Sequence, residues 1–168
     1  GPDPDAVWVD PRMAAIQNAA YRASALLAQE KGAFPLYDRS AFLARPNVLR
    51  LAPDVQALIA KHGIRNGCLT SIAPTGTISL LADNVSSGIE PVFDFVYQRR
   101  VLDSTGKPQE QAVEDYAHRS FRKKFGADAP LSEAFVTAND LTPSAHLSMQ
   151  AALQPCVDSA ISKTINCP

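Results

Sequence analysis

The sequence predicts a helix-rich α/β fold, and three observations lead to it. Apolar residues recur at helical spacing after three helix-start signals, at Asp10-Pro11, at Pro53 and at Thr142-Pro143. Residues 68–73 and 93–102 have instead the β-branched and aromatic composition of strands. A chain of 168 residues is also long enough to bury one sizeable core. We therefore expect a single α/β domain.

The first two helices have clear ends in the sequence. One should begin with Asp10 as its cap and proline at its first position, and should end at Gly32. The other should run from Pro53 to Gly63. Glycine suits both ends because it adopts the left-handed conformation at little cost. The first helix is expected to bury a face that carries Met13, Ile16, Ala20, Ala23 and Leu27.

Three strands are expected. Cys68–Ala73 is a mainly apolar run that Pro74 ends, and its composition suits a strand covered on both faces. Phe93–Leu102 alternates between apolar and polar residues, although Val96, Arg99 and Leu102 interrupt the pattern. Ser159–Asn166 is the last of the three strands.

Two further helices complete the expected order. Pro108–Phe125 should form a helix with one apolar face, and its Asp115 and Arg119 have the i,i+4 spacing of an ion pair. Its four basic residues near the C-terminal end complement the helix dipole, so we interpret them as a solvated face. Thr142-Pro143 should start the final helix.

Composition excludes several classes of protein. A net charge of -1 with 20% charged residues gives no electrostatic basis for binding DNA or RNA. No secretory signal opens the sequence, and no apolar run reaches the roughly 20 residues that span a bilayer. We expect a cytoplasmic protein without membrane contact. Gly1-Pro2 resembles the remnant that a protease leaves after tag removal, so the domain is expected to cover residues 3–168.

The cysteines give no sign of a disulfide framework or a metal site. Cys68, Cys156 and Cys167 are odd in number and widely spaced, and no CxxC pair or histidine at ligand spacing accompanies them. We interpret Cys68 and Cys156 as small buried or half-buried hydrophobic residues.

The turn Thr75–Ser79 has the chemistry of a phosphate-binding site. A buried strand would lead into Pro74, and Thr75, Gly76, Thr77, Ile78 and Ser79 would then open a helix whose first N–H groups have no internal partners. Gly76 leaves room for an anion to approach. Alternatively, Thr75 or Thr77 merely caps a short helix. The sequence has neither the lysine of a P-loop nor a GxGxxG motif.

The loop that follows could line the rest of a ligand site. Ser86, Ser87, Gly88 and Glu90 hold groups that hydrogen-bond locally. Glu90 has no evident partner in the sequence, which makes a general acid/base role improbable. His62 and His146 are also isolated, so no catalytic residue is assigned.

Three stretches resemble the adenosylcobalamin-dependent, or class II, ribonucleotide reductases. The most specific is "NGCLTSIAPTGTISLLADNVSSGIEPVF", Asn66 to Phe93. "LAQEKGAFPLYD", Leu27 to Asp38, and "HLSMQAALQPCVDSAISKTINCP", His146 to Pro168, resemble family segments in the same order. The resemblance covers most of the chain.

The resemblance implies a fold, a chemistry and a set of contacts. The fold would be part of a ten-stranded α/β barrel, with residues 103–140 as a helical excursion from it. The family reduces the 2'-carbon of ribonucleotides by cysteine thiyl-radical chemistry with adenosylcobalamin. By position, Thr75–Ser79 would receive the substrate phosphates, and Ser86–Pro91 would form a neighbouring loop. The partners would be the ribonucleotide and the remainder of the reductase chain.

The sequence also departs from the family pattern. It has no Asn-x-Cys-x-Glu motif for the radical cysteine, and Cys68, Cys156 and Cys167 do not match the redox pair. We therefore expect the chain alone to be inactive, to bind no cofactor and to self-associate. It could be a truncated reductase, one piece of a split reductase, or a non-catalytic nucleotide- or partner-binding module. A helical interaction protein with no small ligand is the remaining alternative, and it would bury the Thr75–Ser79 turn.

Overall fold

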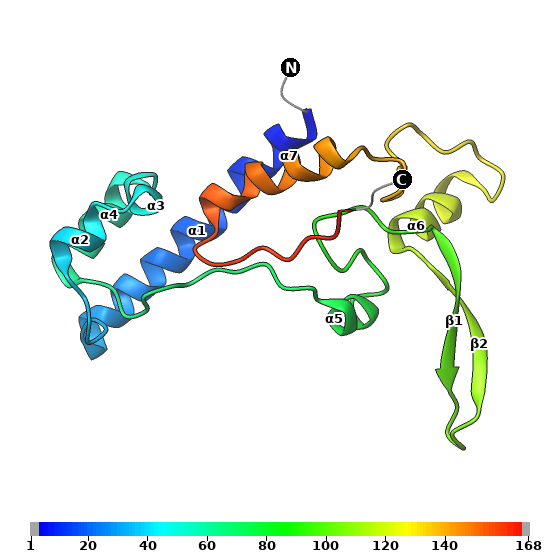
Figure 1. The fold of residues 1–168 in the computed structure, drawn as a ribbon, viewed down its shortest axis with the longest axis horizontal. Coiled ribbons are helices and arrows are strands. Elements are labelled where there is room, and N and C mark those ends of the chain that lie inside the picture. The colour runs from blue at the N-terminus through cyan, green and yellow to red at the C-terminus, as the bar shows by residue number, and fades with distance from the viewer. Residues whose placement is uncertain (1–3, 166–168) are drawn as a thin grey trace. The chain divides into compact units, whose positions relative to one another are not determined.

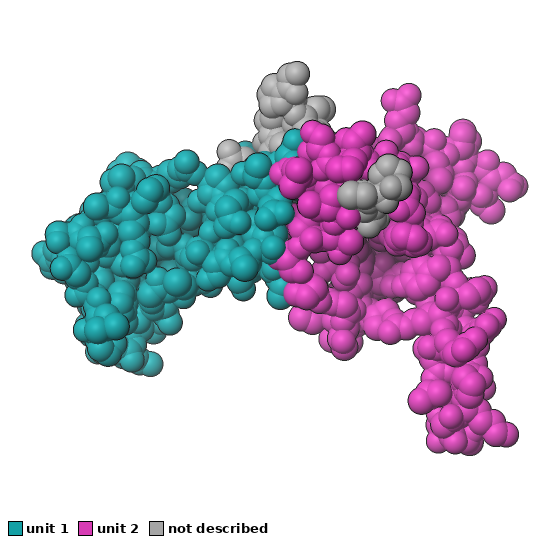
Figure 2. All heavy atoms as spheres, viewed as in Figure 1, with its two compact units in different colours: residues 1–73, 148–161 teal, residues 74–147, 162–168 magenta. Residues whose placement is uncertain are grey.

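The computed structural model describes residues 4–165, and residues 4–10 by their backbone alone. The chain divides into two compact units, coloured separately in Figure 2. The first unit contains residues up to 73 together with 148–161, and the second contains 74–147 and the residues from 162 onward. A single domain over residues 3–168 stays a prediction.

The first unit is helical. It contains α1 (Pro4–Lys31), α2 (Arg39–Leu43), α3 (Pro46–Leu49), α4 (Pro53–His62) and the short 3-10 helix η1 (Gln154–Cys156). The start expected for the first helix is wrong, because α1 begins at Pro4 and Pro11 lies inside it. The other three ends are confirmed: Gly32 follows α1, and α4 runs from Pro53 to its cap Gly63, both glycines having positive φ.

The core of the first unit lies between α1 and the short helices α2 to α4. Its buried residues are Tyr21, Ala25, Phe42, Val48, Leu51, Val55, Ile59 and Ile64. The face expected to be buried on α1 is wrong, because Ile16 and Leu27 are exposed. The face of α1 that is buried carries Tyr21 and Ser24 instead. Ser24 Oγ donates to Asn66 Oδ1 at 2.9 Å, a polar contact that holds this face inward.

The expected strands Cys68–Ala73 and Ser159–Asn166 are reduced to one parallel bridge, between Ile72 and Ile161. Ser159 N–H donates to Thr70 O at 3.0 Å, so the two extended segments do run side by side. Strands of a parallel sheet are paired by successive hydrogen bonds along their length, whereas these two segments share a single bridge within the described residues. Asn166 lies outside the described residues.

The second unit contains a helix, a hairpin and two further helices. These are α5 (Gly76–Leu81), β1 (Val96–Leu102), β2 (Pro108–Glu114), α6 (Tyr116–Phe125) and the start of α7 (Pro143–Leu153). β1 and β2 pair antiparallel in the hairpin of Figure 1, with Arg99 opposite Gln111. The expected start of α7 is confirmed, since Thr142 Oγ1 accepts from Ala145 N–H.

The first half of the helix expected at Pro108–Phe125 is wrong. Asp103 Oδ1 accepts from Thr105 N–H at 2.8 Å and from Lys107 N–H at 3.0 Å, and Gly106 has a φ of 82°. These bonds close a hairpin turn, and β2 takes the place of the first helical turns. Residues 103–140 are consequently not wholly helical.

The expected Asp115–Arg119 ion pair is also wrong. Asp115 caps α6 by accepting from His118 N–H at 2.9 Å, and Arg119 pairs instead with Asp83.

The described residues form a helix-rich α/β arrangement with one two-stranded sheet. Within that part of the chain, no helix combines the length and apolar character that crossing a membrane requires.

Candidate functional site

The loop before α5 is tied to the loop after it. Thr75 N–H and Thr75 Oγ1 both donate to Ser87 O, at 3.2 and 2.7 Å. Thr75 is the residue at the N-cap position, yet its side chain makes no capping bond, and Thr77 lies inside the helix. The alternative in which either threonine merely caps a helix is therefore wrong, because the Thr75 hydroxyl joins two loops instead.

The start of α5 is open to solvent. Gly76 N–H is directed to Pro74 O at 2.7 Å, and the first helical bond runs from Ser79 N–H to Thr75 O at 2.8 Å. Helix geometry leaves the N–H groups of Thr77 and Ile78 without an intrahelical acceptor. Both residues and Gly76 are exposed, and a Cβ added at Gly76 would meet nothing within 4 Å. Gly76 is thus needed neither for a left-handed turn nor by tight packing within the described residues.

A hollow of about 390 Å³ adjoins this helix start, and we call it the turn hollow. Its lining residues are Gly76, Thr77, Ser79, Leu80, Asn84, Ser87, Tyr97 and Arg99. Arg99 comes from β1 and is half-buried, and no ion pair is formed by it within residues 4–165. Sequence reasoning missed Arg99, although it is one of three residues, with Val96 and Leu102, that interrupt the alternation of the strand.

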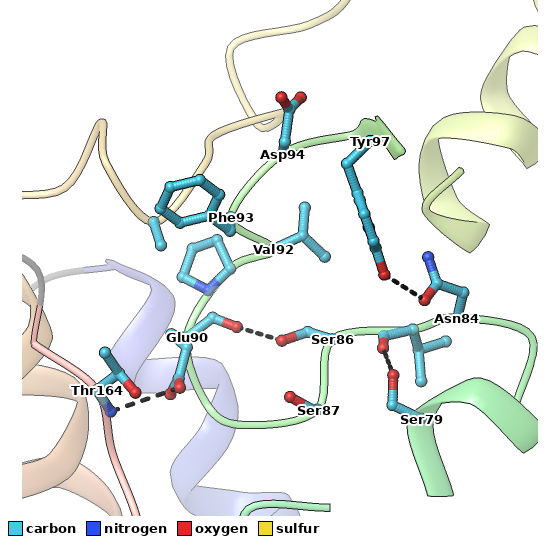
Figure 3. Close-up of a pocket in the computed structure, with 13 residues that line it drawn as sticks. Ser79, Asn84, Ser86, Ser87, Glu90, Val92, Phe93, Asp94, Tyr97 and Thr164 are labelled. Atoms are coloured by element: carbon cyan, nitrogen blue, oxygen red, sulfur yellow. Dashed lines mark hydrogen bonds between the residues drawn. The ribbon is translucent and has the colours of Figure 1, made fainter. Parts of the chain in front are cut away.

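A second hollow of about 470 Å³, the main pocket, is shown in Figure 3. Its lining residues include Ser79, Asn84, Ser86, Ser87, Glu90, Phe93, Asp94, Tyr97 and Thr164. Ser79, Asn84, Ser87 and Tyr97 also line the turn hollow, so the two spaces adjoin. The structure therefore brings one predicted residue of the turn, Ser79, together with Ser86, Ser87 and Glu90 of the loop.

Three other predicted residues lie outside these linings. Thr75 lines neither hollow because its side chain is directed to Ser87 O. Ile78 also lines neither, and its side chain is exposed. Gly88 lies under Glu90: a Cβ there would be 2.8 Å from Glu90 Oε2.

Hydrogen bonds within the loop shape the main pocket. Asp83 and Asn84 have positive φ and reverse the chain after α5. Asn84 Oδ1 accepts from Tyr97 O–H at 3.1 Å, and Ser79 Oγ donates to Val85 O, as drawn in Figure 3. The polar wall of the pocket is thereby held by β1 on one side and α5 on the other.

Two residues that the sequence left isolated have partners in the structure. Glu90 Oε2 lies 3.5 Å from Lys163 Nζ, and Lys163 Nζ lies 2.7 Å from Nδ1 of the buried His146. No local signal could have found these contacts, because Lys163 follows Glu90 by many residues and belongs to a different segment.

The cysteines follow the sequence interpretation in part. Cys156 is buried, as expected, but Cys68 is exposed, so its interpretation as a buried or half-buried residue is wrong. Cys167 lies outside them. Within residues 4–165 no group of three or more His, Cys, Asp or Glu residues has a geometry that could hold a metal ion.

Comparison with known proteins decides the family. The family model described as "Ribonucleotide reductase, barrel domain" matches residues 5–168. The chain belongs to the ribonucleotide reductase family. The resemblance predicted from the sequence is thereby confirmed.

Several curated relatives of this reductase chain are named as vitamin B12-dependent enzymes. A "Vitamin B12-dependent ribonucleoside-diphosphate reductase" of Mycobacterium tuberculosis is 36% identical over 93% of this chain and 22% of its own length. One of the same name from Thermoplasma acidophilum is 32% identical over 92% of this chain and 20% of its own length. The chain thus spans about a fifth of the length of these two relatives.

Proposed function

We propose that this chain supplies the substrate-phosphate-binding part of a vitamin B12-dependent ribonucleotide reductase. The observation that carries the proposal is the exposed start of α5, which faces a hollow lined by Arg99 and adjoining a larger pocket. A helical interaction protein would need the turn packed against another element, whereas Gly76, Thr77 and Ile78 are exposed. Family membership and the names of the relatives support the same function.

Each group would have a definite role toward the nucleotide. The N–H groups of Thr77 and Ile78 would donate to phosphate oxygens, with the positive end of the short helix dipole behind them. The Arg99 guanidinium would neutralise phosphate charge and could bind two oxygens at once. Ser86, Ser87 and Glu90 would line the space for the rest of the ribonucleotide.

The radical chemistry would come from elsewhere in the enzyme. Adenosylcobalamin supplies the radical when it is bound, and a cysteine in an Asn-x-Cys-x-Glu motif would carry it; that motif is absent from this sequence. The two hollows have the volume of sites for small ligands, and a corrin exceeds both. These residues do not fit the cofactor, and we assign it no contacts here.

A glycine substitution tests the proposed phosphate site. Gly76→Val places a branched side chain where phosphate oxygens would approach, but its Cβ meets no protein atom within 4 Å and the position requires no left-handed backbone. In the full-length reductase we expect KM for CDP to rise about 10-fold or more, because a lost interaction of 1.4 kcal/mol is a factor of ten. Ala82→Val, at the exposed C-terminal end of the same helix, is the matched control and should leave KM unchanged.

The 168-residue chain allows a direct binding measurement. Pyrophosphate should bind with millimolar affinity, about -4 kcal/mol, because the opposite wall of the site is not supplied by this chain. Amide NMR shifts on titration should appear at residues 75–80 and should be lost in Gly76→Val but kept in Ala82→Val. Shifts that appear elsewhere and not at residues 75–80 would show that the phosphate site is misplaced.

A further inference from the structure

A buried lysine contacts three different groups beneath the main pocket. The side chain of Lys163 is 2% exposed. Its Nζ lies 2.7 Å from His146 Nδ1, 2.9 Å from Thr164 O and 3.5 Å from Glu90 Oε2. His146 Nδ1 and Thr164 O lie within hydrogen-bond distance of the ammonium group, and the Glu90 carboxylate is its ion-pair partner.

The histidine in this set has a defined tautomer. His146 Nε2 lies 3.1 Å from Ala138 O, and a carbonyl oxygen can only accept, so Nε2 carries the proton. His146 Nδ1 is then a lone pair that accepts from the Lys163 ammonium. His146 thus orients the ammonium group by accepting a hydrogen bond from it. Within the described residues, Glu90 is the anionic partner of Lys163.

The carboxylate of Glu90 lies against the loop that it belongs to. All three of its carboxyl atoms lie within 2.9 Å of the position that a Cβ of Gly88 would take. Glu90 Oε1 is 3.5 Å from Thr164 N–H, and no hydrogen-bond donor of residues 4–165 reaches the buried Oε2. Glu90 O accepts from Ser86 Oγ at 2.6 Å, which closes the loop around Gly88 (Figure 3).

The same loop anchors the start of α5. Ser87 lies between Ser86 and Gly88, and its carbonyl oxygen accepts both bonds from Thr75. Thr75 O in turn accepts the first helical bond of α5, from Ser79 N–H. A continuous series of contacts therefore leads from the Lys163 ammonium through Glu90 and Ser87 to the turn hollow.

We propose that Lys163 is a positioning residue of the ribonucleotide site, which holds Glu90 over Gly88 and so fixes the loop that anchors the start of α5. The role rests on the proposed function, because it concerns the affinity of that site. Removing the ammonium leaves the half-buried Glu90 carboxylate, whose Oε2 is buried, without its cation, and we expect the carboxylate to turn toward solvent. That movement frees the backbone of residues 86–90 and, through Ser87 O, the N-terminal end of α5.

The test compares two variants of the full-length reductase. Lys163→Met removes the ammonium, and Arg122→Met is the matched control because it destabilises α6 in the same unit, where Arg122 binds Ala129 O. We expect Lys163→Met to raise KM for CDP about 10-fold with kcat within about 2-fold, since misplacing binding groups costs affinity first. Arg122→Met should lower the melting temperature but leave KM unchanged.

Hydrogen exchange provides a readout that does not depend on activity. In Lys163→Met, amides of residues 75–79 and 86–90 should exchange faster than in the unsubstituted enzyme, whereas Arg122→Met should leave them protected. A merely stabilising lysine would produce the same changes in both variants at equal loss of melting temperature. Equal changes, or an unchanged KM in Lys163→Met, would overturn the proposal.

A double variant keeps the test decisive if Lys163→Met does not fold. Glu90→Gln with Lys163→Met leaves no unpaired buried charge, yet it still removes the contact that holds residue 90 over Gly88. We expect it to fold and to retain a raised KM; a wild-type KM would contradict the role of Lys163.

If Gly76→Val raises KM and Lys163→Met does not, the positioning role alone fails. If Gly76→Val has no effect, the phosphate site itself is wrong.

Discussion

The hydroxyl of Tyr21 donates a hydrogen bond to the carboxylate of Asp158, which follows it in the chain by 137 residues. Asp158 Oδ1 also accepts from Asn47 Nδ2 at 2.9 Å, and Oδ2 accepts from Leu69 N–H at 2.8 Å. One carboxylate thus joins α1, α3 and the two extended segments of the first unit. Tyr21 is 1% exposed, so its hydroxyl has no access to bulk water.

This environment predicts a loss of stability at alkaline pH. Burial, and then the bond to Asp158, raise the pKa of Tyr21 above its usual value of 10.0. The unfolded chain therefore loses this proton at lower pH than the folded chain does. The free energy of unfolding should fall as pH rises above 10, by at most about 1.4 kcal/mol per pH unit from this group.

Urea unfolding between pH 8 and pH 11 measures this effect. Tyr21→Phe should lower stability at pH 8, because the hydrogen bond to a charged group is lost, by about 1.5–3 kcal/mol. It should also flatten the decline above pH 10. A decline in Tyr21→Phe as steep as in the unsubstituted chain would exclude Tyr21 as its source.

Two adjacent arginines provide a second prediction, on ligand binding. Arg99 lines the turn hollow, whereas Arg100 pairs with Glu110 across the exposed hairpin, at 3.9 Å. Arg99→Ala should weaken pyrophosphate binding to the chain about 10-fold, as expected for a charge-assisted phosphate contact. Arg100→Ala removes the same charge from the neighbouring position and should change affinity much less. Equal losses would mean that net charge, and not the hollow, determines binding.

Self-association is the third prediction. Leu81 is 90% exposed at the end of α5, where Ile78 and Leu80 are exposed as well, and a group of exposed apolar residues favours contact with another chain. Both edges of the β1–β2 hairpin are unpaired within the described residues and could add a further strand.

Sedimentation should show a dimer or a larger assembly, which Leu81→Ser should weaken. Leu36→Ser, at an 89% exposed leucine of the other unit, is the control. A monomer at high concentration would argue for a self-contained protein.

The fourth prediction concerns catalysis by the chain alone. With adenosylcobalamin, a dithiol and CDP, the purified chain should produce no dCDP, because no positioned cysteine is available to form a thiyl radical. Chromatographic detection of dCDP measures this, with full-length reductase as the positive control. Production of dCDP by the chain, in a preparation that contains no full-length reductase, would contradict the prediction. Activity that appears only when the rest of the reductase is added would indicate a split reductase.

Local signals in the sequence predicted the helices best. Gly32, Gly63 and the Thr142-Pro143 start are confirmed because capping depends on the residue at the cap itself. The helix expected at Pro108–Phe125 failed where a turn competed with it. Proline at position 108 was interpreted as a helix start, whereas the Asp103 carboxylate and Gly106 form a hairpin turn just before it.

Contacts between distant residues were beyond this reasoning. Sequence pattern identified Ser79, Ser86, Ser87 and Glu90, which the structure brings to one pocket. It could not identify Arg99 or Lys163. Both lie in segments distant from the turn in the sequence, and no residue near them indicates that the fold brings them to it. The strand expected at Cys68–Ala73 failed for a similar reason, since a strand is defined by the partners along its edges.

The contact between Gly88 and Glu90 also constrains how this loop can diverge over evolution. Any side chain at position 88 would put its first carbon within 2.9 Å of the carboxylate and push it away from Lys163. With an acidic residue at 90, a larger residue at 88 therefore requires the end of the Glu90 side chain to shift, whereas a lineage that loses the acid has no such requirement. Substitution of Gly88 should accordingly weaken the contact between Glu90 and Lys163, and it should be tolerated more readily where residue 90 is not acidic.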